Sequence, residues 1–351
     1  MATTEVFTAT ATGTNDYENY YDDDYQDEVC NKTSVIHFGA NITPIFFSFV
    51  VLLSLFGNIL VIWILAKYEN LKSLTNTFIL NLAVSDLFFT TGLPFFAYYH
   101  MYGWTFGDAA CKIVNFVFCV GFYSSGIILI LMTAHRYKAV MNPLSALVSP
   151  TCCYSVLACV TIWASSVLLA SPAFLFTEVQ NQNHCVYMNS FWSLWGIYQQ
   201  NILFIISSIV FLFCYSQIMC RLLRPPAQRR KNKTLKLIFT LMVVFFVGWT
   251  PYNIVIFLKS LYFWPKPPAD SNALPAICKS SERLDYTFFV SRLFAFSHCC
   301  LNPVFYVFVG VKFKNHLKKM LKCLGNGNSS IRNRQSRLTI TSLTSGDEFS
   351  M

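Results

Sequence analysis

The chain is poor in charged residues. Asp, Glu, Lys and Arg make up only 12% of its 351 residues, against about 25% in soluble domains, whereas hydrophobic residues make up 54%. This balance argues against a soluble globular domain and favours a chain that lies in lipid. We expect membrane lipid among its partners and no nucleic acid.

Sequence motifs of catalysis are also missing. The chain has no P-loop, no nucleophile elbow, and no cluster of His and Cys at the spacing of a metal site. We therefore expect no enzyme. It has no internal repeat, which argues against a transporter. A cleavable signal peptide is not visible either, because the first 28 residues are polar and acidic.

Long apolar stretches, in contrast, occur seven times before the composition turns polar near Gly325. Each is long enough to cross a bilayer of about 30 Å as a helix, which takes ~20 residues. The predicted fold class is an all-α membrane protein, a seven-transmembrane helix bundle with a short amphipathic eighth helix. The predicted spans are roughly 43–67, 74–101, 110–136, 152–174, 194–222, 234–262 and 284–308.

The domain organisation follows from these spans. Residues 1–42 form a disordered acidic arm, 43–308 the bundle, 309–324 an amphipathic helix on the membrane surface, and 325–351 a disordered cytoplasmic tail. With the N-terminus outside, the cytoplasmic loops and tail hold 19 of the 26 Lys and Arg residues. Because positively charged short loops stay in the cytoplasm, we expect an extracellular N-terminus at the plasma membrane. Cys323 is a candidate for palmitoylation.

The arm concentrates acidic and aromatic residues. Its first 28 residues hold eight of the chain's 17 acids and no Lys or Arg. Tyrosines in such a context are substrates for sulfation, which adds further negative charge. Either the arm captures a basic extracellular ligand, or it only solvates the N-terminus. The tyrosines concerned are Tyr17, Tyr20, Tyr21 and Tyr25.

The predicted outer segments also carry residues that can be modified. Four of the 13 cysteines fall there, where disulfides persist, and sequence alone does not choose among their three pairings. Asn31 and Asn41 begin N-x-[ST] motifs and are candidates for glycosylation. The four cysteines are Cys30, Cys111, Cys185 and Cys278.

Few ionisable residues lie inside the spans, and one of them, Asp86, has polar companions. A charge there costs about 2.5–3.5 kcal/mol on insertion scales, so it needs partners. The companions are Asn58, Ser125, His298 and Asn302, the last two of which lie on one helix face. The cluster either only fixes helix packing, or it also acts as a protonation switch or holds an allosteric sodium ion. The sodium ligands would then be Asp86, Ser125, His298 and Asn302.

The sixth span combines two large rings with a proline. Phe245 and Trp249 are one helical turn apart, and Pro251 removes a backbone hydrogen bond beside them. A ligand that presses on Trp249 would swing the inner half of this span. The alternative is plain aromatic packing.

The inner ends of three spans bring polar residues together. Arg136 follows His135 at the end of the third span, and Tyr215 and Tyr306 end the fifth and seventh. We expect these side chains to form a polar contact that can rearrange. The tail beyond is rich in Ser and Thr and suited to phosphorylation.

Taken in order, these motifs resemble the rhodopsin-like family of G-protein-coupled receptors over residues 45–323. One such motif would be weak evidence, whereas eight in register are specific. They are Gly57-Asn58, Asn81-Leu82-Ala83 with Asp86, Cys111, Arg136-Tyr137, Trp163, Cys185, Trp249 with Pro251, and Asn302-Pro303-x-x-Tyr306.

The resemblance implies roles for individual residues. Cys111 pairs with Cys185, and Arg136 contacts a heterotrimeric G protein. Arrestin and receptor kinases are further implied partners. The full implied G-protein contact is His135, Arg136, Tyr137 and Tyr215, and the implied activation switch is Phe245, Trp249, Pro251, Asn302, Pro303 and Tyr306.

Within that family the chain looks like a chemokine receptor. The acidic arm, a Cys30 and Cys278 pair that joins this arm to the third outer loop, and HCCLNP at 298–303 are similar to that group, and HRY at 135–137 is similar to its lymphotactin-binding XC type. Such receptors bind a small basic chemokine and signal through an inhibitory-type G protein to chemotaxis and calcium release. The implied ligand-binding residues are the four arm tyrosines, Phe96, Phe118, Tyr252, Tyr286 and Arg292.

Several residues depart from the commoner chemokine-receptor pattern, and two of them bear directly on signalling and ligand binding. His135 stands where an aspartate normally pairs with the arginine and restrains the resting state. Arg292 stands where many members carry a glutamate, so we expect the deep pocket to prefer acidic ligand groups. A light or small-amine receptor is disfavoured, since the seventh span lacks a lysine and Phe118 replaces the amine-binding aspartate. The main alternative is a receptor that scavenges chemokine without signalling.

Overall fold

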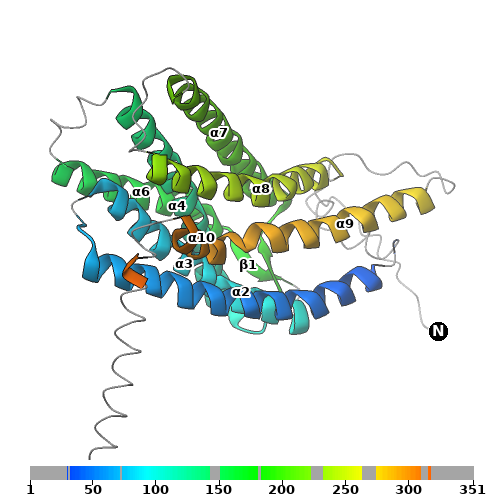
Figure 1. The fold of residues 1–351 in the computed structure, drawn as a ribbon. Helices are drawn as coiled ribbons and strands as arrows, with labels where there is room; N and C mark the ends of the chain where they lie inside the picture. The colour runs from blue at the N-terminus through cyan, green and yellow to red at the C-terminus, as the bar shows by residue number, and fades with distance from the viewer. Residues whose placement is uncertain are drawn as a thin grey trace, which may run out of the picture.

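Long helices dominate the computed structural model, which describes residue 30 and residues 32–71, 73–142, 151–180, 183–222, 232–262, 274–309 and 315–317 (Figure 1). In chain order the elements are α2 (Thr33–Tyr68), α3 (Leu74–Tyr102), α4 (Gly107–Met141), α6 (Thr151–Leu175), β1 (Thr177–Gln180), β2 (His184–Tyr187), α7 (Ser190–Leu222), α8 (Asn232–Tyr262), α9 (Leu274–Phe296) and α10 (His298–Val309).

Seven segments of the described chain are long and apolar enough to cross a membrane, with α9 and α10 together forming the seventh. Large apolar side chains face outward along them, for example Phe56 (73% exposed) and Leu168 (72% exposed). An apolar exterior is stable only in lipid, so the predicted seven-helix membrane fold is confirmed.

Two spans begin about ten residues earlier than predicted. The first helix begins at Thr33 instead of near residue 43, and the seventh begins at Leu274 instead of near 284. The added segments mix apolar residues with polar and charged ones, which is why a search for apolar runs misses them; the polar ones include His37 and Asn41 in the first helix and Lys279, Glu282 and Arg283 in the seventh. They contact each other, since Ser34 Oγ donates a hydrogen bond to Glu282 Oε1 at 3.1 Å.

The seventh span is also interrupted. The helical pattern breaks at Ser297, whose carbonyl accepts hydrogen bonds from the amides of Cys300 (3.1 Å) and Leu301 (3.2 Å). The sequence reading treated this span as continuous. The break turns one carbonyl, that of Cys299, toward Asn58 of α2.

Several predicted features lie outside the described residues. They include most of the acidic arm, the tail 325–351, and the larger part of the amphipathic helix, of which only residues 315–317 are described and are helical. His316 Nε2 lies 3.1 Å from Glu69 Oε1, which joins this turn to the segment after α2. The modification candidates outside the described residues are Tyr17, Tyr20, Tyr21, Tyr25, Asn31 and Cys323.

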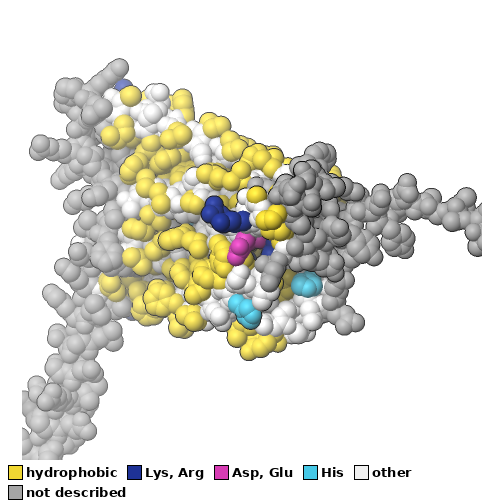
Figure 2. All heavy atoms as spheres, turned by 90° about the vertical axis from the view of Figure 1, so that its right-hand side faces the viewer, with side chains coloured by type: hydrophobic (Ala, Val, Ile, Leu, Met, Phe, Trp, Pro, Cys, Tyr) yellow, Lys and Arg dark blue, Asp and Glu magenta, His cyan; other side chains and the backbone are white. Residues whose placement is uncertain are grey.

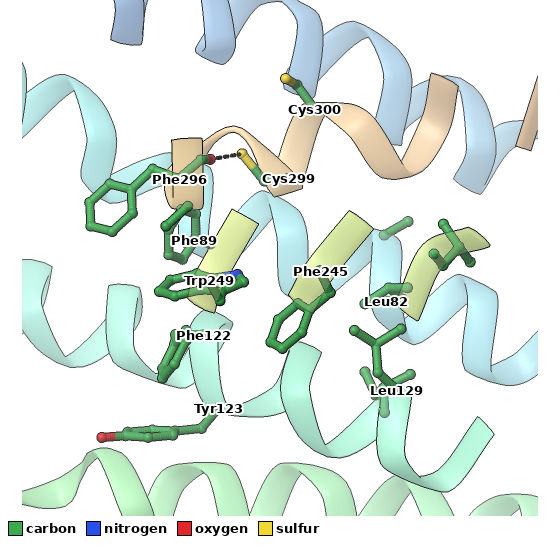
Figure 3. Packing of buried hydrophobic residues seen from close by; sticks show 14 of the residues in the cluster. Leu82, Phe89, Phe122, Tyr123, Leu129, Phe245, Trp249, Phe296, Cys299 and Cys300 are labelled. Carbon is green, nitrogen blue, oxygen red and sulfur yellow. Dashed lines mark hydrogen bonds between the residues drawn. The ribbon is translucent and has the colours of Figure 1, made fainter. Parts of the chain in front are cut away.

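The core of the bundle is aromatic at the level of Trp249, which comes from α8. Figure 3 shows its indole between Phe89 of α3 and Phe122 of α4, with ring centroids 6.4 and 4.6 Å away. Phe296, at the end of α9, packs on the same ring at 6.0 Å. Four helices therefore meet around one side chain that is 2% exposed.

A short hairpin lies at one end of the bundle. Strands β1 and β2 pair antiparallel with Val179 opposite Cys185. The Cys111–Cys185 disulfide ties this hairpin to the first turns of α4. The sequence reading did not predict these strands, which are only four residues long.

Candidate functional site

Both disulfides lie at the same end of the bundle. Cys30 pairs with Cys278, with their Cα atoms 5.4 Å apart, and Cys111 pairs with Cys185 at 5.7 Å. Both pairings implied by the family resemblance are therefore confirmed. The first joins the residue at the end of the acidic arm to the start of α9.

Several charged side chains at this end form ion pairs. Asp285 of α9 is 8% exposed and lies 2.7 Å from Lys259 Nζ of α8 and 3.5 Å from Lys32 Nζ. Figure 2 shows this end of the molecule, where Lys or Arg side chains lie beside Asp or Glu side chains within a largely hydrophobic surface. The ion pairs hold the start of α2 and the end of α8 against the middle of α9.

Below the disulfides, aromatic side chains from α3, α4 and α8 that were predicted to bind the ligand lie in one region, which we call the crevice. Phe96 of α3 packs edge-on against Phe118 of α4 at 4.9 Å. Tyr252 of α8 lies 5.6 Å from the Trp249 ring. Tyr286 turns toward α2 instead, where it contacts Phe38 at 5.3 Å. The structure thus joins Phe96, Phe118 and Tyr252 to the core around Trp249 and sets Tyr286 nearer the rim.

Arg292 of α9 is the cation of this crevice. Its Nη2 contacts His100 Nε2 of α3, and its guanidinium lies over the rings of Phe288 (5.4 Å) and Phe289 (5.2 Å). Its Nε is buried with no hydrogen-bond partner. Among the described residues no carboxylate lies within ion-pair distance of it. A guanidinium in such surroundings favours an anionic partner.

Two residues of this crevice were missed by the sequence reading. His100 was not singled out, although it contacts Arg292. Tyr187 of β2 was also missed, and it reaches from the hairpin toward the bundle. Burial raises the pKa of Tyr187, and the nearby Cys119 and Tyr252 side chains raise it further. Its phenol therefore stays neutral and able to donate a hydrogen bond at physiological pH.

The predicted aromatic switch is assembled as expected. The rings of Phe245 and Trp249 lie 5.8 Å apart on α8. A void of about 10 Å³ lies beside them and is lined in part by Gly126, Ser207 and Asn253. The indole Nε1 of Trp249 is buried without a hydrogen-bond partner among the described residues. No polar contact therefore fixes this ring, and packing alone holds it.

Asp86 lies at the centre of the predicted polar cluster. It is 0% exposed, accepts a hydrogen bond from Asn302 Nδ2 at 2.8 Å and one from Ser125 Oγ at 3.4 Å, and lies 3.8 Å from His298 Nε2. Asn58 does not join it, because its amide donates to the carbonyls of Ser54 and Cys299. Asp86, Ser125, His298 and Asn302 are thus brought together as predicted.

The side chains around Asp86 can accommodate a small monovalent cation or a proton. Asp86 and Ser125 supply the oxygen atoms that hard cations prefer. In the described part of the chain no Lys or Arg lies within ion-pair distance of Asp86. A buried carboxylate without a cationic partner is costly, and either species would remove that cost.

At the opposite end of the bundle, Arg136 has an unpredicted partner. Its Nη2 donates a hydrogen bond to Thr75 Oγ1 of α3 at 2.8 Å. His135, where the commoner pattern has an aspartate, turns its ring edge-on to Phe78 at 6.3 Å. Tyr215 is 5% exposed, and its hydroxyl has no hydrogen-bond partner among the described residues. The predicted contact of Arg136 with Tyr215 is therefore not a hydrogen bond in this state.

Comparison with known proteins places the chain in a family. Residues 57–306 match the model of the 7 transmembrane receptor (rhodopsin family). Chemokine XC receptor 1 of Homo sapiens is 41% identical over 303 residues, which cover 86% of this chain and 87% of the relative. The Mus musculus protein of the same name is 42% identical, with coverage of 85% and 89%.

A further relative, C-C chemokine receptor type 4 of Homo sapiens, is 36% identical over 318 residues, with coverage of 88% and 86%. The family match at residues 57–306 includes the Cys111–Cys185 disulfide, Arg292 and Arg136. The chain belongs to the rhodopsin family of seven-transmembrane receptors and, within it, to the chemokine receptors that resemble the XC type.

Proposed function

We propose that the chain is a plasma-membrane receptor that binds a small basic chemokine of the XC class outside the cell and activates a heterotrimeric G protein inside. The observation that carries this function is the Cys30–Cys278 disulfide, which joins the residue just after the acidic stretch of the sequence to α9. In this orientation the disulfide end is extracellular and the Arg136 end is cytoplasmic.

Binding proceeds in two steps. The arm, with eight acids and no Lys or Arg in its first 28 residues, attracts the basic chemokine at long range. The flexible end of the ligand then enters the crevice, where Phe96, Phe118 and Tyr252 offer apolar contacts and Arg292 offers a positive charge. The arm thus supplies attraction, and the crevice supplies selectivity.

Activation follows from the contacts of Trp249. Since packing alone holds the indole, a ligand that pushes on Tyr252 shifts Trp249 and, through Pro251, bends α8. The inner end of α8 then moves outward and exposes Arg136 to an inhibitory-type G protein. Receptor kinases and arrestin act later on the Ser- and Thr-rich tail. The ligand acts by shifting a balance between two existing states.

The first experiment measures inhibition of cyclic AMP in cells that express the chain, against a panel of chemokines that includes lymphotactin. A response to lymphotactin that pertussis toxin blocks would support both the ligand class and the inhibitory G protein. Fluorescent-ligand uptake is measured in parallel. Uptake without any response would favour the scavenger receptor instead, and no uptake and no response would refute the XC assignment.

His135→Asp is expected to lower basal signalling. An aspartate at this position places a carboxylate next to Arg136, in addition to the observed hydrogen bond to Thr75. A hydrogen bond to a charged group contributes about 1.5–3 kcal/mol. The population of the resting state relative to the active state therefore rises roughly tenfold or more. Basal cyclic AMP is compared at matched surface expression, with Thr75→Ala expected to change it in the opposite direction. Equal basal signalling in wild type and His135→Asp would contradict this restraint.

Asp86 with Ser125 would hold a sodium ion, or Asp86 a proton, in the resting state, with His298 and Asn302 beside them. A sodium ion there would neutralise the buried carboxylate. We expect sodium chloride, but not choline chloride, to weaken agonist binding to wild type, and Asp86→Asn to remove this difference. A dependence of agonist binding on pH that Asp86→Asn removes, without dependence on sodium, would select the proton. If neither ion changes binding, the cluster serves packing only.

A further inference from the structure

A groove on the outside of the bundle runs between α8 and α9 near the disulfide end. Its volume is about 540 Å³, which falls within the ~300–1,000 Å³ range of ligand pockets. Both helices belong to membrane-spanning segments at this level. The groove therefore opens toward lipid, and the molecules that can reach it are those of the bilayer.

The two walls of the groove differ in chemistry. The α8 wall is apolar, with Pro251, Ile254 (53% exposed) and Leu258 (40% exposed). The α9 wall carries Arg283 together with the hydroxyl residues Ser280 and Thr287. An occupant that satisfies both walls is an amphiphile with a hydrocarbon part and a polar head that carries a negatively charged group such as a phosphate.

Arg283 is available to such a head group. The two nearest carboxylates in sequence are engaged elsewhere: Glu282 accepts the hydroxyl of Ser34, and Asp285 pairs with Lys259 and Lys32. Arg283 itself is exposed, and no carboxylate of the described chain lies within ion-pair distance of it. A guanidinium matches a phosphate in charge and geometry.

The order of the lining residues sets the orientation of an occupant. Ser280 lies next to the disulfide-bonded Cys278 at the end of the bundle, and Thr287 lies seven residues further along α9, about 10 Å deeper into the membrane. The polar groups of Ser280 and Arg283 thus lie nearer the disulfide end of the groove, and the apolar side chain of Pro251 lies deeper in the membrane. A head group at Arg283 would leave its chain pointing toward the bilayer centre.

We propose that this groove binds one membrane phospholipid, with its phosphate at Arg283 and Ser280 and an acyl chain along Leu258 and Ile254 toward Pro251. The lipid fills the gap between α8 and α9 two residues from Trp249. Its binding requires no chemokine, so this proposal stands or falls independently of the proposed function.

The test uses the full chain in lipid nanodiscs that contain phosphatidylcholine with a photoreactive diazirine in one acyl chain. After illumination, labelled peptides are identified by mass spectrometry. We expect labels concentrated on the peptides that carry Ile254, Leu258 and Leu284. Arg283→Gln is expected to lower this labelling about tenfold, since it removes a charge-assisted hydrogen bond. Arg283→Lys should restore part of it.

Lys279→Gln is the matched control. Lys279 is also an exposed cation of α9 but does not line the groove, so its replacement should leave the labelling unchanged. Uniform labelling of all outward helix faces, or labelling that Arg283→Gln does not change, would overturn the proposal. A photoreactive cholesterol that labels the groove equally in wild type and Arg283→Gln would assign the groove to a sterol and overturn it as well.

Discussion

Arg292→Glu is expected to abolish the response to an XC-class chemokine at concentrations that saturate the wild type. The crevice offers Arg292 two aromatic faces and His100 but, among the described residues, no carboxylate within ion-pair distance. An acidic group of the ligand completes this site. Removing one partner of a buried charge pair costs about 2–5 kcal/mol, which lowers affinity at least about 30-fold, and reversing the charge adds repulsion.

Three variants separate this explanation from misfolding. Arg292→Lys keeps the charge but loses the planar fork, so a moderate loss is expected, whereas Arg292→Gln should fall between it and Arg292→Glu. Surface expression and binding of an antibody to a folded epitope are measured for each. A chemokine whose acidic residue near the flexible end is replaced by lysine should partly restore the response of Arg292→Glu. A response of Arg292→Glu equal to that of wild type would eliminate the anionic subsite.

The sequence predicts the boundaries of a span well where the apolar run that lies in lipid has the same length as the helix. The second predicted span, 74–101, and the observed helix Leu74–Tyr102 agree because apolar residues predominate along the whole of that run. The early starts of α2 and α9 are not predictable in this way. Their added segments mix apolar with polar residues. They are held by contacts that are distant in sequence: the Cys30–Cys278 disulfide, whose residues are 248 positions apart, and the Lys32–Asp285 ion pair, whose residues are 253 positions apart.

In the candidate site, too, the sequence predicts some residues and misses others. Motif resemblance identified Arg136 and Arg292, but not the side chains that hold them. Thr75 lies 61 residues from Arg136, and His100 lies 192 residues from Arg292. No local sequence motif marks either partner, because a threonine or a histidine near a helix end can have many roles. Only the packing of α3 against α4 and α9 brings these side chains together.

Replacing Gly121 of α4 with alanine is expected to destabilise the receptor strongly. A Cβ at this position would lie 2.4 Å from the backbone nitrogen of Phe89 and 2.8 Å from the carbonyl oxygen of Ser85. Both are backbone atoms of α3, so relief requires the two helices to separate. Small residues allow such close approach of membrane helices. Overpacking typically costs about 1–3 kcal/mol, and a clash with backbone falls at the upper end.

Gly126→Ala is the matched control for Gly121→Ala, because it lies on the same helix and its added Cβ would meet only the Leu203 side chain at 3.8 Å. Alanine in a helix is about 0.5–1 kcal/mol more favourable than glycine, so this variant should be as stable as wild type or more stable. Thermal unfolding of both purified variants in detergent, followed by size-exclusion chromatography, measures the difference. We expect a lower unfolding temperature and less surface expression for Gly121→Ala alone. Because Phe89 packs against Trp249, that variant should also lose signalling out of proportion to its expression. Equal unfolding temperatures for the two variants would mean that α3 and α4 are not as close at this level as the structure places them.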